Sequence, residues 1–245
     1  MTAPVFLADL TAAATGTTLR LDGAEGRHAA AVRRLAAGER VDLTDGAGGF
    51  AECVVAVADR DSLQLEVLVR KDFPAPVLSL TVVQALPKGD RGELAVDLLT
   101  EVGVDEIVPW AASRCVTQWR GDRGDKALAK WRAHAREAGK QSRRPWFPDV
   151  TAAASTRDVA VLLGAASAGY VLHESATTSL AAQEIPYEGS VVLVVGPEGG
   201  ISDEELAIFT AAGALVTRLG PTVMRTSTAG VAAAAAVLSR TGRWS

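Results

Sequence analysis

The stretch VVLVVGPEGGISDEEL, residues 191–206, constrains the fold more than any other part of this sequence. Its first five residues are apolar and four of them are valine, which predicts a strand buried on both faces, as in a parallel sheet. The glycine-rich loop GPEGG ends this strand. Ser202 then stands three residues before Glu205, a capping box that predicts the start of a helix, and Gly213 predicts its end. The order is therefore buried strand, glycine loop and helix N-terminus.

A second stretch, residues 215–230, repeats this order. A short strand is expected before Gly220 and Pro221, and a helix is expected to start near Thr226 or Ser227. Ligands bind outside the carboxyl ends of the strands in open α/β sheets, and glycine lets the backbone approach a ligand closely. A single glycine pair would fit an ordinary tight turn equally well. Two such loops together favour a ligand site.

The two halves of the chain differ in their pattern. The first 72 residues read mostly as β, with a short helix ending at Gly38 and a hairpin turn at 45–49. After the proline-rich segment at 73–76, strands alternate with helices, as an α/β fold with a parallel sheet requires. Further strands are expected at 77–86, 104–110 and 168–174. Further helices are expected at 124–141, at 156–163 and before Gly103, the last with an apolar face of Leu94, Leu98 and Val102.

Charge is concentrated in one segment. Residues 114–144 contain ten Lys or Arg against three acidic residues, although the whole chain carries a net charge of −4. A basic segment in an otherwise acidic protein suggests a face that binds a polyanion. Trp119, Trp131 and Trp146 interleave with these charges and favour RNA, because aromatic rings stack on unpaired bases. A solvated helix is the alternative explanation.

Composition excludes several classes of protein. A hydrophobic content of 48% with 22% charged residues is typical of a globular protein. The sequence shows neither a signal-peptide pattern nor an apolar run long enough to span a bilayer, so no membrane association is expected. Cys53 and Cys115 lie far apart in no metal-binding spacing, which predicts free thiols, no metal and a cytoplasmic location.

Several motifs together resemble one enzyme family. GPEGGIS at 196–202 and LGPTVMRTSTA at 219–229 resemble the cofactor-binding motifs of the SPOUT methyltransferases. Residues 85–110 and 134–144 are similar to the bacterial family that methylates N3 of a uridine in 16S ribosomal RNA, and residues 27–49 resemble its N-terminal PUA-like β domain. The resemblance implies a parallel-sheet SPOUT domain that contains a trefoil knot. The domains expected are a PUA-like β domain at 1–72, a linker at 73–77 and a SPOUT domain at 78–245.

The same resemblance implies S-adenosylmethionine as the cofactor, bound in a bent form between three loops at strand ends. Backbone groups would read the adenine edge and apolar side chains would flank its faces. One departure is Ser227, where many relatives are expected to carry Glu; a serine there is still expected to cap a helix. The cofactor-binding residues expected are Leu172, Gly196, Gly199, Gly200, Leu219, Gly220, Val223 and Met224.

Methylation at N3 of uridine requires loss of an imide proton, so negative charge develops on the ring and must be stabilised. We expect Arg225 to supply the cation; a salt bridge from Arg225 to Glu198 is the alternative. A carboxylate beside an arginine accepts a proton poorly, so Glu198 is expected to organise the loops. The proton would then leave to solvent or to His173, which could equally be an ordinary histidine at a strand end.

The expected partners are 16S ribosomal RNA, free or within the small subunit, and a second copy of the chain. The helix at 230–238 has small residues that could pack about a two-fold axis. A SPOUT enzyme acting on transfer RNA or 23S RNA and a non-catalytic RNA-binding module remain alternatives, whereas the phosphate-binding motif of nucleotide hydrolases is absent from the sequence. The RNA-binding residues expected are His28, Arg33, Arg34, Lys88, Arg91, Arg136, Gln141, Arg143 and Arg144.

Overall fold

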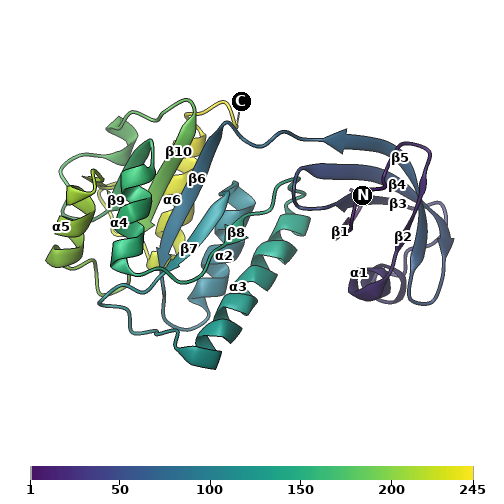
Figure 1. Cartoon of the computed structure of the whole chain (residues 1–245), viewed down its shortest axis with the longest axis horizontal. Helices are drawn as coiled ribbons and strands as arrows, with labels where there is room; N and C mark the ends of the chain where they lie inside the picture. The colour runs from purple at the N-terminus through teal and green to yellow at the C-terminus, as the bar shows by residue number, and fades with distance from the viewer. Residues whose placement is uncertain (1, 245) are drawn as a thin grey trace. The chain divides into compact units, whose positions relative to one another are not determined.

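A computed structural model describes residues 2–244 and divides them into two compact units (Figure 1). The N-terminal unit comprises the residues up to Ala75 together with Gly139–Phe147. The C-terminal unit comprises Pro76–Ala138 and the residues from Pro148 onward. Among the described residues, no helix has the length and apolar character needed to cross a membrane.

The N-terminal unit contains a five-stranded sheet in the order β1-β3-β4-β5-β2. All neighbouring pairs are antiparallel except β1 and β3, and β4 has two register shifts against β5. Alternate side chains of the long strands fill the core, in which Cys53 is a free and fully buried thiol. The strands are β1 (Val5–Leu7), β2 (Thr18–Leu21), β3 (Arg40–Thr44), β4 (Gly49–Ala58) and β5 (Leu63–Asp72).

The helix of this unit differs from the expected one. It starts earlier, as α1 (Gly23–Arg27), continues as a π-helical turn (His28–Val32) and stops well before Gly38. Arg34 then adopts a left-handed backbone with φ of 56°, which ends any helical path. The prediction of a helix running to Gly38 was therefore wrong. Nothing in the run of alanines and arginines indicates that Arg34 adopts a left-handed conformation, which terminates the helix.

The C-terminal unit contains a six-stranded sheet in the order β11-β9-β10-β6-β7-β8, with all neighbouring strands parallel. This confirms the predicted α/β fold with a parallel sheet. The five residues from Val191 to Val195 are each at most 4% exposed, as expected for a strand covered on both faces. The strands are β6 (Leu78–Ala85), β7 (Glu106–Trp110), β8 (Asp149–Val150), β9 (Ala168–Leu172), β10 (Gly189–Val195) and β11 (Leu215–Thr217).

Helices pack on this sheet in two pairs: α6 packs on α2, β6 and β10, whereas α4 packs on α5 and β9 (Figure 1). The helices are α2 (Arg91–Val102), α3 (Gly121–Gln141), α4 (Thr156–Ala165), α5 (Asp203–Ala211) and α6 (Thr226–Leu238). Ser202 and Glu205 form the predicted capping box of α5, and Gly103 ends α2 in a left-handed conformation. The trefoil knot stays a prediction.

The buried face of α2 is not the predicted one. Leu94 is 46% exposed, and the face that packs inward instead carries Ala95, Val96 and Leu99. The reason lies at Gly92, where an added Cβ would come within 2.7 Å of the Trp131 ring. The side of α2 that carries Gly92 thus faces Trp131 of α3, and Leu94 lies toward solvent while Leu98 and Val102 stay half-buried.

The segment Gly139–Phe147, which the sequence analysis assigned to the SPOUT domain, packs with the N-terminal unit. Lys140 donates to Glu25 over 2.8 Å, and Arg143 forms an ion pair with Asp42 and donates to the carbonyl of Ala3. The aromatic rings of Trp146 and Phe147 cover the turn between β3 and β4, where the positive φ angles of its glycines admit no larger residue. The end of α3 and the segment after it are therefore part of the β unit.

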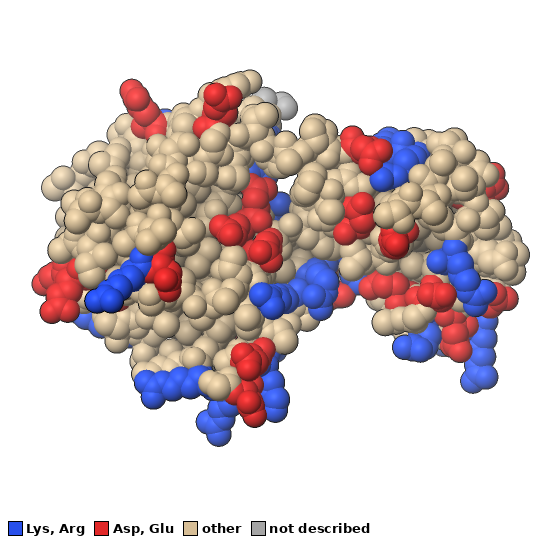
Figure 2. Space-filling model, in the orientation of Figure 1, with Lys and Arg blue, Asp and Glu red and all other residues tan. Residues whose placement is uncertain are grey.

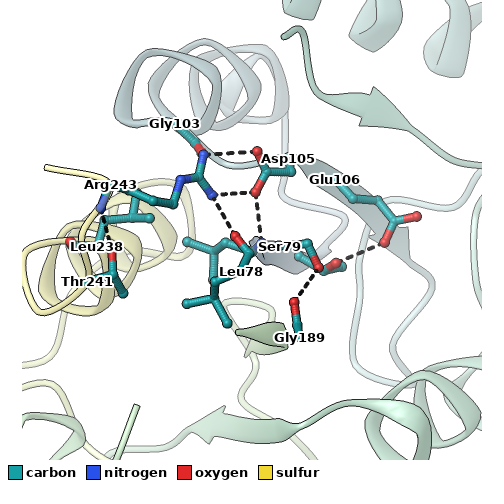
Figure 3. A network of polar contacts seen from close by, with 11 residues as sticks. Leu78, Ser79, Gly103, Asp105, Glu106, Gly189, Leu238, Thr241 and Arg243 are labelled. Atoms are coloured by element: carbon teal, nitrogen blue, oxygen red, sulfur yellow. Dashed lines mark hydrogen bonds and ion pairs between the residues drawn. The ribbon is translucent and has the colours of Figure 1, made fainter. Parts of the chain in front are cut away.

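Arg243 ties the end of the chain to the amino ends of β6 and β7 (Figure 3). Its guanidinium pairs with both carboxylate oxygens of Asp105 and donates to the carbonyls of Leu78 and Gly103, over 3.3 and 2.8 Å. The Asp105 carboxylate also accepts from the backbone N–H of Leu80 over 2.8 Å. This network fixes the residues that follow α6, whose other end borders the cavity described next.

Candidate functional site

A cavity of about 410 Å³ lies at the carboxyl ends of three neighbouring strands, β11, β9 and β10. In the sheet register, Leu172 at the end of β9 lies beside Val195 of β10 and Thr217 of β11, so the three following loops start at the same edge. This is the edge at which parallel α/β sheets bind ligands. The loops contribute Leu172 to Glu174, most of the residues from Val195 to Ile201, and Arg218 to Thr226.

The first loop follows β9, which ends at Leu172 rather than at the predicted residue 174. The backbone N–H of His173 continues the sheet by donating to Thr217 over 2.9 Å. Its Nδ1 atom accepts from the backbone N–H of Ser175 over 3.3 Å and lies 2.8 Å from the Ser175 hydroxyl oxygen. The nitrogen that could take a proton is thus engaged by Ser175 when the ring is neutral. His173 lines the cavity, but its geometry favours a local structural role.

The second loop carries the predicted glycines. Gly196 and Gly200 line the cavity. A Cβ at Gly196 would lie 2.7 Å from Ile201, and Gly200 has a φ of 74°, so both positions require glycine. Gly199 is not among the lining residues; a Cβ there would lie 3.1 Å from the Cβ of Arg114. The close approach that Gly199 permits is therefore to another part of the protein.

Glu198 contacts a different loop from the expected one. Its Oε1 atom accepts from the backbone N–H of Lys88 over 3.3 Å and so joins the second loop to the loop after β6. No ion pair links Glu198 to Arg225 in the part of the chain that the structure describes, so the alternative role considered for Arg225 is not realised. Both side chains line the cavity.

The third loop places Leu219, Gly220, Val223 and Met224 on the cavity. A Cβ at Gly220 would meet nothing within 4 Å and would project into open space. Val223 is 80% exposed and Met224 40% exposed, so this loop offers apolar surface that no other described part of the chain covers.

The third loop ends at α6, whose N-cap residue is Arg225. Ser227 is buried in the first turn instead of capping the helix, so the expected cap was wrong. The start of α6 is hydrogen-bonded to Gln84 of β6, which is fully buried and donates through its amide to the carbonyl of Thr226 over 3.3 Å. The position of the third loop therefore depends on a side chain of the central strand β6.

The rim of the cavity is basic. Arg91, Arg218 and Arg225 line it together with Glu174 and Glu198, and Lys88 and Arg114 contact the second loop. None of these five cations has an ion-pair partner within residues 2–244. Arg218 was not predicted, although its place directly before Leu219 could have revealed it, and Arg91 was expected to bind RNA rather than to line this cavity.

The predicted RNA-binding residues fall into several places. Arg33 and Arg34 are exposed after the π-helical turn, whereas His28 is half-buried with its ring edge against Phe6. Arg136 and Gln141 are exposed on α3. Figure 2 shows basic and acidic side chains mixed around the first turns of this helix, as on a solvated surface. Arg143 is already neutralised by Asp42, and the backbone N–H of Arg144 donates to Gly139.

Metal ligation has little support in the geometry. Across residues 2–244, no group of three His, Cys, Asp or Glu side chains is arranged to hold a metal ion. Cys115 is free and buried, and burial raises the pKa of its thiol, so it is a poor nucleophile and a poor ligand.

Comparisons with known proteins agree with this geometry. A family model described as an RNA methyltransferase domain matches residues 74–238, and one described as an RNA methyltransferase PUA domain matches residues 21–68. A Mycobacterium bovis protein named ribosomal RNA small subunit methyltransferase E is 48% identical over 100% of this chain and 94% of its own length. A Bacillus subtilis protein of the same name is 26% identical over 91% of each chain.

A solved structure extends the comparison. The ribosomal RNA small subunit methyltransferase E of Neisseria gonorrhoeae, crystallised with S-adenosyl methionine, is 26% identical and covers 97% of this chain and 98% of its own, with a TM-score of 0.86. One assignment thus accounts for both domains and for the overall fold. The chain belongs to the RNA methyltransferase family whose members carry an N-terminal PUA domain.

Proposed function

We propose that this protein transfers the methyl group of S-adenosylmethionine to a nucleotide in the RNA of the small ribosomal subunit. The observation that carries the proposal is the cavity of about 410 Å³ at the carboxyl ends of β11, β9 and β10, in a chain whose family model spans residues 74–238. The names of the mycobacterial and Bacillus relatives support small-subunit ribosomal RNA as the substrate, and the Neisseria structure supports S-adenosylmethionine as the cofactor.

The residues of the cavity fit this cofactor. Leu172, Leu219 and Met224 offer apolar surface for an adenine ring, and the backbone at Gly220 is open to close approach. When bound, S-adenosylmethionine supplies a methyl group activated by its positively charged sulfur. The role of the protein is therefore to orient that group and exclude water from it.

The charge at the rim supports a second, anionic ligand. S-adenosylmethionine carries a net positive charge at neutral pH, because its carboxylate and ammonium groups cancel and the sulfonium remains. Arg91, Arg218 and Arg225 outnumber the two glutamates that line the cavity, so the rim would repel the cofactor on balance. An RNA strand explains this surplus, since phosphate contacts by Lys and Arg supply most of the affinity for nucleic acids.

We propose N3 of uridine as the methylated atom. Loss of the imide proton spreads negative charge over the ring nitrogen and its flanking oxygens. Arg225 is exposed, lines the cavity and makes no ion pair with Glu198, so its guanidinium is available to stabilise this charge. Because Ser175 engages the basic nitrogen of His173, solvent is the better acceptor for the proton.

The assembly proposed is a homodimer. The exposed loop around Val223 and the small half-buried residues of α6 lie next to the cavity and could pack against a second copy about a two-fold axis. Light scattering should give twice the chain mass at micromolar concentration. A fully active monomer would exclude this assembly.

The experiment that tests the function compares Arg225→Gln with the wild-type protein on RNA from small subunits of a strain that lacks the gene. Wild type should form one methylated uridine, and Arg225→Gln should lower turnover at least a hundredfold, the size seen when one charge-stabilising donor is lost. Its affinity for S-adenosylmethionine, measured by calorimetry, should stay within about threefold of wild type. Arg120→Gln, an exposed arginine outside the cavity, is the matched control.

A further inference from the structure

The loop that joins β7 to α3, residues 111–120, is hydrogen-bonded to the loop after β6 and to the second cavity loop. The hydroxyl of Thr117 donates to the carbonyl of Pro87 over 2.8 Å, in the loop after β6. The guanidinium of Arg114 donates through Nη1 to the carbonyl of Gly199 over 3.3 Å, in the second cavity loop. These two hydrogen bonds hold the β7–α3 loop against both of them.

A third attachment, through Glu205, makes the β7–α3 loop rigid. The carboxylate of Glu205, 4% exposed, accepts from the backbone N–H of Ser113 over 2.8 Å, directly before Arg114. It also accepts from the hydroxyl of Thr156 over 3.1 Å and from Ser202 in the capping box. Burial raises the pKa of Glu205, but these hydrogen bonds, led by the one from Ser113, outweigh it and keep the pKa below its ordinary value. The anchor thus stays ionised.

The side of Gly199 where a Cβ would project faces Arg114. Gly199 does not line the cavity, and a Cβ there would lie 3.1 Å from the Cβ and 3.3 Å from the carbonyl oxygen of Arg114. The glycine that the motif places here therefore lets the arginine backbone lie directly on the second loop. Arg114 itself is exposed, and among the described residues its guanidinium makes only the bond to Gly199. Four of its five N–H donors stay available.

We propose that Arg114 is an RNA-positioning residue whose guanidinium binds a phosphate next to the target nucleotide. This proposal rests on the proposed RNA substrate. The bond to Gly199 orients the guanidinium, and the Glu205 anchor fixes the backbone from which it extends. A planar fork with free donors suits a phosphate better than a lysine would. Because the side chain stands beside the second loop and outside the cofactor cavity, its contact with RNA is separate from cofactor binding.

The test compares Arg114→Gln and Arg114→Lys with Arg120→Gln, which removes an exposed arginine of the same loop whose side chain makes no hydrogen bond or ion pair within residues 2–244. Steady-state methylation of small-subunit RNA would be measured at several salt concentrations, with cofactor affinity by calorimetry and folding by thermal unfolding. Arg114→Gln should raise KM for RNA about tenfold, the effect of one charge-assisted hydrogen bond, with kcat nearly unchanged. The slope of log affinity against log salt should become shallower by about 0.7.

Arg114→Lys should retain the salt slope of wild type and show an intermediate KM, because it keeps the charge and loses the fork. The proposal is overturned if Arg114→Gln matches Arg120→Gln, if its salt slope equals that of wild type, or if its cofactor affinity weakens as much as its KM for RNA rises. If the wild-type protein methylates no small-subunit RNA, the proposed function fails. If wild type and Arg114→Gln methylate it equally well, only the role of Arg114 fails.

Discussion

Arg143 belongs to the basic segment that charge alone assigns to RNA, yet its contacts predict a structural role. Its guanidinium pairs with Asp42, whose side chain is almost fully buried, and donates to the carbonyl of Ala3. Burial raises the pKa of Asp42, although Arg143 acts in the opposite direction. Arg143→Glu would place a second carboxylate against a buried one. Removing one partner of a buried pair costs about 3–5 kcal/mol.

The Arg143 side chain is 36% exposed, so the expected loss in the free energy of unfolding is smaller, about 2–4 kcal/mol. Urea unfolding followed by circular dichroism measures it, and Arg136→Glu, an exposed residue of α3 seven positions before Arg143, should stay within about 0.5 kcal/mol of wild type. Asp42→Asn combined with Arg143→Met should be more stable than Arg143→Met alone, because no buried charge is left unpaired. An Arg143→Glu protein that keeps its stability and loses RNA affinity would refute this reasoning.

Three further predictions concern the C-terminal unit. Gly199→Ala should displace the loop of Arg114 and lower stability by roughly 1 kcal/mol, with RNA methylation falling more than cofactor affinity in calorimetry. Arg243→Ala should lower the free energy of unfolding by about 2–3 kcal/mol, since it removes the ion pair with Asp105 and the hydrogen bonds to the carbonyls of Leu78 and Gly103; urea unfolding should show no loss in Arg60→Ala. Glu205 has a lowered pKa, so its contribution to stability is present above pH 4.5 and is lost as pH falls further. Glu205→Gln should reduce the fall in the free energy of unfolding below pH 4.5. If that fall is unchanged, other carboxylates cause it.

Local patterns were enough to predict most strands of the parallel sheet and the cavity loops, but not the short strand β8. A run of five buried residues, the capping box of Ser202 and Glu205, and the glycine after α2 each act within a few residues, so they are legible in the sequence. The same holds for the two glycine loops, which the parallel sheet brings to one edge. The sequence therefore predicts well where strands and helices end and which loops lie at the same edge of the sheet.

Contacts between distant residues could not be predicted in this way. Arg143 lies 101 residues from Asp42, and Arg114 lies 85 residues from Gly199. Counting charges treats both arginines alike, although one is neutralised and the other keeps free donors. The inward face of α2 likewise depends on how Trp131 fits over Gly92, which the positions of the leucines do not indicate. Pairing in the folded state, not charge density, separates structural cations from those open to a ligand.

The most direct test of the whole account is the mass of the nucleosides released from small-subunit RNA after incubation with the purified protein and S-adenosylmethionine. The RNA would come from a strain that lacks the gene, and deuterated methyl donor would mark the transferred group. We expect a single labelled 3-methyluridine with wild type and almost none with Arg225→Gln, although that variant binds the cofactor. A labelled methyl group on another atom, or none on this RNA while transfer RNA or large-subunit RNA is labelled, would contradict it.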